Sequence, residues 1–166
     1  MEPTKLQLKA LHEAAHAVAS ESFGWSVKEV VLQETRGVVQ GVSSTIDGWT
    51  ETLHPRPKLE TIGFYIAVAL CGYAAIRRVD CSKKLKQDAV ISVGLDWQTI
   101  EGYFKDLILE PGIKLAAIYD AVAEAESVIN EKLKAIDRIA SVLEKILRIS
   151  GDDVRRIIEE EKAVTP

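Results

Sequence analysis

Two histidines and one glutamate stand together near the start of the chain, in the segment His12-Glu13-Ala14-Ala15-His16. On a helix, residues four apart lie on one face, so both imidazoles can bind the same zinc ion. The glutamate after the first histidine can then reach a water molecule on that ion and act as general base. Because zinc lowers the pKa of such a water to about 7 and polarises a carbonyl group, the segment predicts metal-assisted amide hydrolysis.

A structural pair of histidines is the alternative interpretation, and the flanking sequence favours the metal site over it. Thr4 and Gln7 form a capping-box pattern that begins a helix, and Gly24 suits its end. Apolar residues recur at helical spacing between these ends and place the two histidines beside a buried stripe. The stripe consists of Leu11, Ala14, Ala15 and Val18.

A catalytic zinc site needs a third protein ligand, which the segment itself does not contain. The extended motif with Gly seven and His ten residues after the first histidine fails, because Ala19 and Ser22 stand there. Asp96 precedes an apolar periodic run, where it could equally be a helix N-cap. Spacing alone leaves the choice open among five side chains further along: Glu29, Glu34, His54, Asp88 and Asp96.

The remaining elements must position these residues. Residues 27–45 are rich in β-branched side chains and are interrupted at 34–37, which predicts a two-strand hairpin. Residues 47–57, with Gly48, Pro55 and Pro57, predict an irregular loop that could line a substrate groove. Helices are predicted over 58–79, 95–109 and 113–149, the last with a break near 132–135, and Ser150 with Asp153 three residues later caps a final short helix.

We therefore expect an α+β fold that is mostly helical, with a zinc helix, a small β-hairpin or sheet, and a C-terminal helical bundle. The 166 residues, 47% of them hydrophobic, fit one globular domain over 1–166. Within it, residues 1–110 form the metal-site part and residues 111–166 the C-terminal helices.

Composition argues against several other classes of protein. The formal net charge is −4 and the 21 Lys and Arg residues are scattered, which does not suit a nucleic-acid-binding protein. Cys71 and Cys81 form no CxxC pair, which argues against a thiolate zinc site and against a disulfide framework. Without a basic and apolar leader, a cytoplasmic location is expected. Residues 61–76 are apolar but too short to span a membrane.

Residues 11–18 (LHEAAHAV) resemble the zinc helix of the FtsH family of ATP-dependent zinc metalloproteases, and the order of elements continues the resemblance. Residues 27–45 resemble that family's strand pair, and residues 68–75 (VALCGYAA) are similar to its LxGRAAEE helix. Residues 94–98 (GLDWQ) resemble the approach to the aspartate that completes its zinc site. Residues 139–144 (IASVLE) and 151–154 (GDDV) correspond to its C-terminal helices.

The resemblance implies roles for particular residues. His12 and His16 would be zinc ligands, Glu13 the general base and Asp96 the third ligand, with Asp88 in reserve. The chain departs from the family pattern at four positions outside this set. These are Ala15 in place of glycine, Tyr73 in place of arginine, and Arg77 and Arg78 in place of two glutamates.

No P-loop sequence GxxxxGK[ST] and no membrane anchor is present. The resemblance therefore implies a zinc endopeptidase domain that acts without its own ATPase on unfolded polypeptides or peptides, alone or with a separate ATPase partner. The amphipathic C-terminal stretch favours core packing and a homo-oligomer surface over a membrane-binding face. Two alternatives remain: a catalytically silent binding or adaptor module of the same fold, and hydrolysis of a non-peptide amide.

Overall fold

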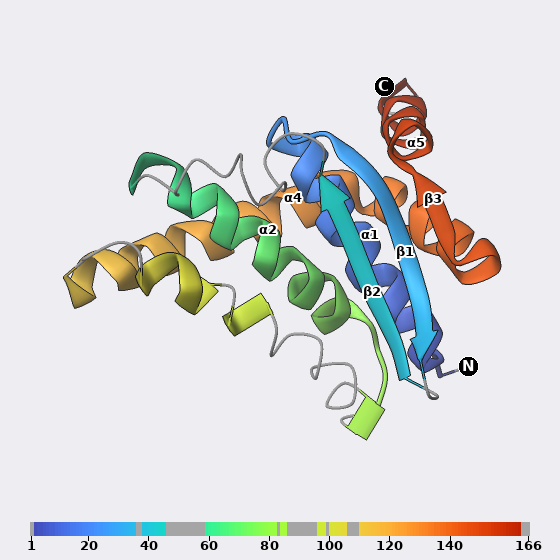
Figure 1. Ribbon diagram of the computed structural model, residues 1–166, viewed down its shortest axis with the longest axis horizontal. Helices are drawn as coiled ribbons and strands as arrows, with labels where there is room; N and C mark the ends of the chain where they lie inside the picture. The colour runs from blue at the N-terminus through green and yellow to red at the C-terminus, as the bar shows by residue number, and fades with distance from the viewer. Residues whose placement is uncertain are drawn as a thin grey trace.

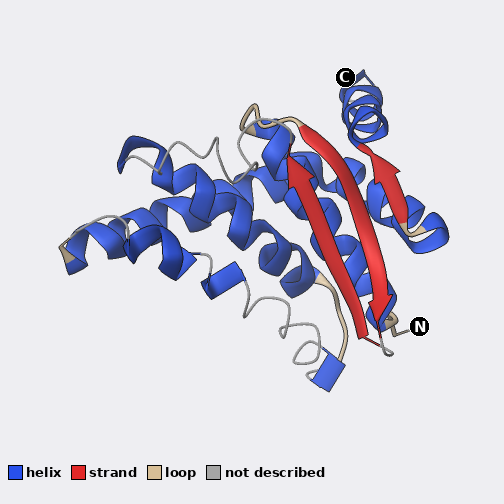
Figure 2. Ribbon diagram, viewed as in Figure 1, coloured by secondary structure: helices blue, strands red, loops and turns tan. Residues whose placement is uncertain are grey.

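A computed structural model describes residues 2–35, 38–45, 59–82, 84–85, 96–98, 100–105 and 110–163. The fold is α+β and mostly helical, with a small antiparallel sheet (Figure 2). Short helical stretches also occupy 96–98 and 100–105. The labelled elements are α1 (Lys5–Ser22), β1 (Val27–Thr35), β2 (Val38–Thr45), α2 (Leu59–Arg78), α4 (Pro111–Ile146), β3 (Arg148–Ser150) and α5 (Gly151–Ala163).

Helix α1 begins and ends where its sequence predicts. The Thr4 hydroxyl accepts a hydrogen bond from the Gln7 backbone N–H at 3.2 Å, and the Gln7 side chain accepts one from the Thr4 N–H at 2.8 Å. This capping box satisfies two backbone donors that a helix start leaves free. Beyond the other end, Gly24 adopts a φ of 80°, which costs glycine little because it lacks a Cβ.

The second half of α1 is the centre of the molecule, because every residue from His12 to Ser20 is buried. Figure 1 shows the helix with the sheet on one side and with α2 and α4 on the other. Alanines at four of these positions keep the helix surface narrow, so neighbouring elements approach its backbone closely. They are Ala14, Ala15, Ala17 and Ala19.

The predicted hairpin is present, and a third strand extends it. Strands β1 and β2 pair antiparallel with Val31 opposite Val42, and β3 pairs antiparallel on the other side of β1, giving the order β2-β1-β3. Leu147 adopts a left-handed conformation with φ 58° at the end of α4, which turns the chain back onto β1. The helix predicted to reach residue 149 therefore ends at Ile146, and the residues after Leu147 form β3.

Two long helices complete the framework. Helix α2 matches the predicted 58–79 to within a residue at each end. Helix α4 begins with Pro111, which suits a first turn because that turn needs no N–H from it, and it is interrupted at Lys132 (φ −115°, ψ 15°), within the predicted break. Ser150 caps α5 by accepting a hydrogen bond from the Asp153 N–H at 3.2 Å.

Several predictions fall outside the described residues. They concern the loop at 47–57, His54, Asp88 and both ends of the helix predicted at 95–109. Among the helices that the structure describes, none combines the length and the apolar character needed to cross a bilayer.

Candidate metal centre

The structure brings together three side chains that the sequence places far apart. His12 and His16 face each other from consecutive turns of α1, with their Nε2 atoms 2.9 Å apart. Asp96, at the start of the helical stretch 96–98, directs Oδ2 to within 3.2 Å of His12 Nε2 and 3.6 Å of His16 Nε2. Two imidazole nitrogens and one carboxylate oxygen thus converge on a single point.

These separations suit a zinc ion. Zinc is four-coordinate and tetrahedral with ligands at about 2.0–2.1 Å, so its ligand atoms lie roughly 3.3 Å from one another. The three observed separations, 2.9, 3.2 and 3.6 Å, scatter around that value. Asp96 Oδ2 is buried, yet among the described residues no donor hydrogen-bonds to it. A cation between the three groups would satisfy that oxygen, and three protein ligands leave a fourth position open, as catalytic zinc sites do.

Helix α2 fixes the orientation of His16. The Nδ1 atom of His16 lies 2.8 Å from the Val68 carbonyl oxygen. Because a carbonyl oxygen can only accept, Nδ1 must carry the proton and donate it. When the imidazole is neutral, the lone pair therefore resides on Nε2, the nitrogen that faces Asp96.

Gly72, one turn further along α2, makes room for both rings. A Cβ atom at this position would lie 2.4 Å from His12 Nδ1 and 2.7 Å from His16 Nε2, closer than real Cβ contacts. No larger residue fits at this position without displacing the imidazoles. His12 Nδ1 itself is buried and has no hydrogen-bond partner among the described residues, so the packing against Gly72 holds that edge of the ring.

Electrostatics couple the three groups when no metal is present. Burial by itself would lower the pKa of His16, but the Asp96 carboxylate 3.6 Å away, helped by Glu13 and the Val68 carbonyl, outweighs it and raises the pKa to about 9. Burial would raise the pKa of Asp96, and the two imidazoles more than reverse this, so the pKa lies well below its usual range. The carboxylate is therefore ionised at neutral pH, as a zinc ligand must be.

Glu13 lies at the edge of the same centre. Its Oε1 is 4.0 Å from His12 Nε2, and its side chain is only 9% exposed. Burial lowers the pKa of Lys9, one turn earlier on α1, while the charge of Glu13 partly opposes this. Glu13 is thus a largely buried carboxylic residue beside the candidate metal position. It is placed where it can exchange a proton with a molecule bound there.

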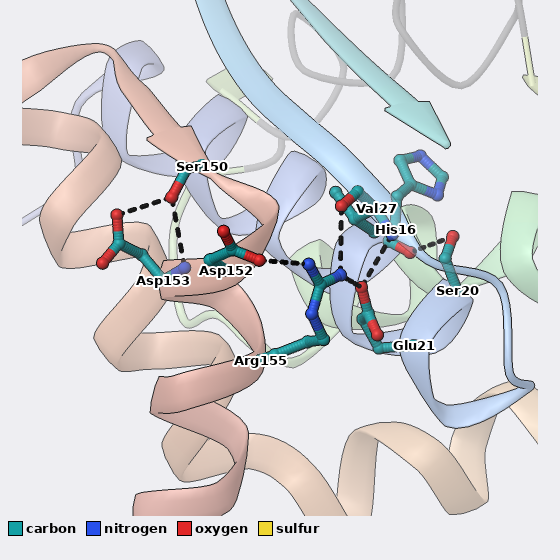
Figure 3. Close-up of polar contacts among 8 residues, drawn as sticks. All are labelled: His16, Ser20, Glu21, Val27, Ser150, Asp152, Asp153 and Arg155. Atoms are coloured by element: carbon teal, nitrogen blue, oxygen red, sulfur yellow. Dashed lines mark hydrogen bonds and ion pairs between the residues drawn. The ribbon is translucent and has the colours of Figure 1, made fainter. Parts of the chain in front are cut away.

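The end of α1 beyond His16 is anchored by helix α5. Glu21 Oε1 accepts hydrogen bonds from the Val27 N–H at 2.7 Å and from Arg155 Nη1 at 2.8 Å. Figure 3 shows the Arg155 guanidinium between Glu21 and Asp152. Its Nη2 donates a hydrogen bond to Asp152 Oδ1 at 2.5 Å. Within α1, the Ser20 hydroxyl donates a hydrogen bond to the His16 carbonyl oxygen at 2.9 Å. This anchoring holds α1 against the sheet and α5.

The other acidic candidates are engaged elsewhere or lie outside the described part. Glu29 on β1 accepts a hydrogen bond from Arg148 Nε on β3 at 2.9 Å, so it belongs to the sheet surface. The side chain of Glu34, together with His54 and Asp88, lies outside the described residues. The ligand roles of His12, His16 and Asp96 and the base role of Glu13 stay predictions, which the geometry accommodates.

Two of the departures from the FtsH pattern have contacts within this chain. Arg77 Nη2 lies 3.3 Å from Glu126 Oε1, and Arg78 donates a hydrogen bond to Asn130, so both arginines join the end of α2 to α4. Tyr73 is 38% exposed on α2. Arg77 and Arg78 thus lie where α2 contacts α4, and none of the three residues is among the candidate metal ligands.

The sequence analysis singled out the candidate ligands His12, His16 and Asp96, but it did not identify the residues that support them. A backbone carbonyl such as that of Val68 leaves no trace in the sequence. Gly72 does not stand out either, because Gly63 of the same helix, where a Cβ would meet nothing within 4 Å, looks the same in the sequence. Comparisons with family models and with curated proteins find no match for this chain.

Proposed function

We propose that this protein is a zinc-dependent metallopeptidase, with His12, His16 and Asp96 as metal ligands and Glu13 as general base. The observation that carries the proposal is the convergence of two imidazole nitrogens and one carboxylate oxygen at mutual distances of 2.9–3.6 Å, next to a buried glutamate. Two histidines and one carboxylate form a ligand set that catalytic zinc sites use.

The chemistry divides between the ion and the chain. Zinc bound there would lower the pKa of a water molecule and polarise the scissile carbonyl group. Glu13 accepts the proton that the water loses as its oxygen adds to the carbonyl carbon. Glu13 then donates that proton to the amide nitrogen as the carbon–nitrogen bond breaks, so the amine leaves neutral and the carboxylate is restored. Val68 keeps the His16 ring in place throughout.

The sheet supports a peptide as the substrate. Within the described residues, β2 pairs only with β1, so its outer edge carries backbone groups without a strand partner. An extended peptide can add to such an edge through main-chain hydrogen bonds. Strand β2 also packs on α1, the helix that bears the histidines (Figure 1). We further propose, by the FtsH resemblance, that the substrate is an already unfolded segment.

The test is proteolysis of a fluorescently labelled casein by zinc-loaded protein. Glu13→Gln should lower kcat/KM by about 100-fold or more, because it removes the general base, while zinc content stays unchanged. The matched control is Glu124→Gln, at an exposed position on α4, which should cleave like wild type.

Zinc-loaded wild type that cleaves no unfolded protein would contradict the peptidase proposal. If it then bound the labelled casein as tightly as the Glu13→Gln form does, the chain would be a binding module of the same fold.

A further inference from the structure

Helix α4 presents an apolar face that no described element covers. Its N-terminal half lies at the end of the molecule away from the sheet (Figure 1). On this half, Leu115 is 54% exposed, Tyr119 68% and Val122 37%. Side chains this large and apolar are usually buried when they recur at helical spacing. The face therefore needs an explanation beyond the fold of one chain.

The residues between Gly112 and Ala123 that share this face are all uncharged. Six exposed residues fall within about 120° of the helix circumference, at about 100° per residue. They are Gly112, Leu115, Ala116, Tyr119, Val122 and Ala123. Lys114, Asp120 and Glu124 lie outside that sector, whereas Glu126, the next residue inside it after Ala123, carries a charge at its C-terminal end. We call these six residues the α4 apolar face.

The face is complementary to itself. Two antiparallel copies related by a two-fold axis at Tyr119 bring residue n of one copy to the level of residue 238 − n of the other, which pairs residues equally far from Tyr119. Leu115 then lies level with Ala123, and Val122 with Ala116. Each bulky side chain meets a small one, so the two surfaces interdigitate, and the two Tyr119 rings meet at the axis.

Charge favours the same arrangement. It places Glu126 of each copy at the level of Gly112 of the other, in the first turn of α4. That turn contains no acidic residue, and Glu110 at its N-cap makes no side-chain capping hydrogen bond. A helix N-terminus carries a partial positive charge, so a carboxylate from a second copy stabilises it. Arg77 can keep its contact with Glu126 there, since both side chains are at least half exposed.

We propose that the α4 apolar face is a homodimer interface in which two copies of α4 pack antiparallel across Tyr119. The α4 apolar face spans about 17 Å of helix from Gly112 to Ala123, so the area that it can bury is small beside the roughly 800 Å² per partner of a standard interface. The dimer is accordingly of the weak, concentration-dependent kind.

Sedimentation velocity of the full chain over about 5 to 500 µM covers the range expected for such a dimer. Wild type should shift from monomer to dimer, and Tyr119→Glu should raise the dissociation constant by about tenfold or more, because it places two charges at the centre of an apolar interface. The matched control is Ile146→Glu, which changes a residue of similar exposure, 63%, at the far end of the same helix. It should dimerise like wild type.

The register has its own readout. In a Cys81→Ser background, Tyr119→Cys should form an oxidised cross-linked dimer, since a residue on the two-fold axis lies next to its own copy, whereas Ile146→Cys should not. Wild type that stays monomeric at every concentration would overturn the proposal, as would a dimer that Tyr119→Glu leaves intact. Monomeric wild type that binds phosphatidylcholine vesicles, with Tyr119→Glu unable to do so, would assign the face to a lipid surface instead.

Discussion

His16 connects the protonation of the site with metal binding. Its Nδ1 is committed to the Val68 carbonyl, so only Nε2 can change its proton. Asp96 and Glu13 favour the charged ring strongly enough to outweigh burial, and the pKa rises to about 9. In metal-free protein at neutral pH, this ring therefore holds an extra proton on the very nitrogen that the proposal assigns to zinc.

Zinc binding should consequently release about one proton from His16. Because the protonated form dominates below pH 9, zinc affinity should rise with pH until about pH 9 and then level off. Calorimetric titration in buffers of different ionisation enthalpy, at about pH 7.5 and about pH 10, measures the proton count directly. Release of about one proton near neutrality and almost none at the higher pH is expected, and no release at either pH would contradict the assignment of His16 as a ligand.

Helix α2 supports the site in two ways. The Val68 carbonyl oxygen accepts a hydrogen bond from His16, and Gly72 leaves room for both imidazoles. Gly72→Ala would place a methyl group 2.4 Å from His12 Nδ1, so the rings must move apart. We expect zinc affinity to fall by about 10- to 100-fold, as when other supports of a metal site are lost, with a stability cost of about 1–3 kcal/mol for overpacking.

Gly63 offers a control on the same helix, because a Cβ there meets nothing within 4 Å. Gly63→Ala should leave zinc affinity unchanged and stabilise the protein by about 0.5–1 kcal/mol, since alanine favours helix more than glycine does. Zinc titration and thermal unfolding of the two variants separate the effects. Equal zinc affinity in both would show that Gly72 does not shape the site.

The contact between α1 and α5 belongs to the element scale as well. Arg155 joins Glu21, Asp152 and the Val27 carbonyl, and the Glu21 side chain is only 12% exposed. Arg155→Met should destabilise the fold by about 1–3 kcal/mol, because Glu21 loses a charged partner in a sheltered place.

Arg156 is the natural comparison, since it pairs with Asp153 in an exposed i,i+3 contact. Arg156→Met should change stability by less than about 0.5 kcal/mol. Urea unfolding of both variants measures the difference. If both lost the same stability, the anchoring of α1 by α5 would contribute nothing specific.

At the scale of the molecule, elements with local sequence signals were predicted. Elements that depend on contacts between distant segments of the chain were not. The capping box at Thr4 and the β-branched run at 27–45 act over a few residues, so α1 and the hairpin followed from sequence. Strand β3 has only three residues and forms by pairing with β1, over a hundred residues away, so no local pattern announces it.

The candidate site shows the same division. His12, Glu13 and His16 stand in one helical segment, and their spacing alone suggested the chemistry. Asp96 comes from a separate helical stretch, and spacing left it among five candidates until the FtsH resemblance singled it out. Its approach to His12 at 3.2 Å depends on how that stretch packs against α1, which is a property of the whole fold.

Zinc binding by wild type, Asp96→Ala and Glu29→Ala tests the central claim most directly. Calorimetric titration should give one zinc per chain for wild type and for Glu29→Ala, whose carboxylate pairs with Arg148 in the sheet. Asp96→Ala should lose at least about 100-fold in affinity, because it removes a ligand and not merely a supporting group. Wild type that binds no zinc, or Asp96→Ala that binds it as tightly as wild type, would contradict a metal centre built from His12, His16 and Asp96.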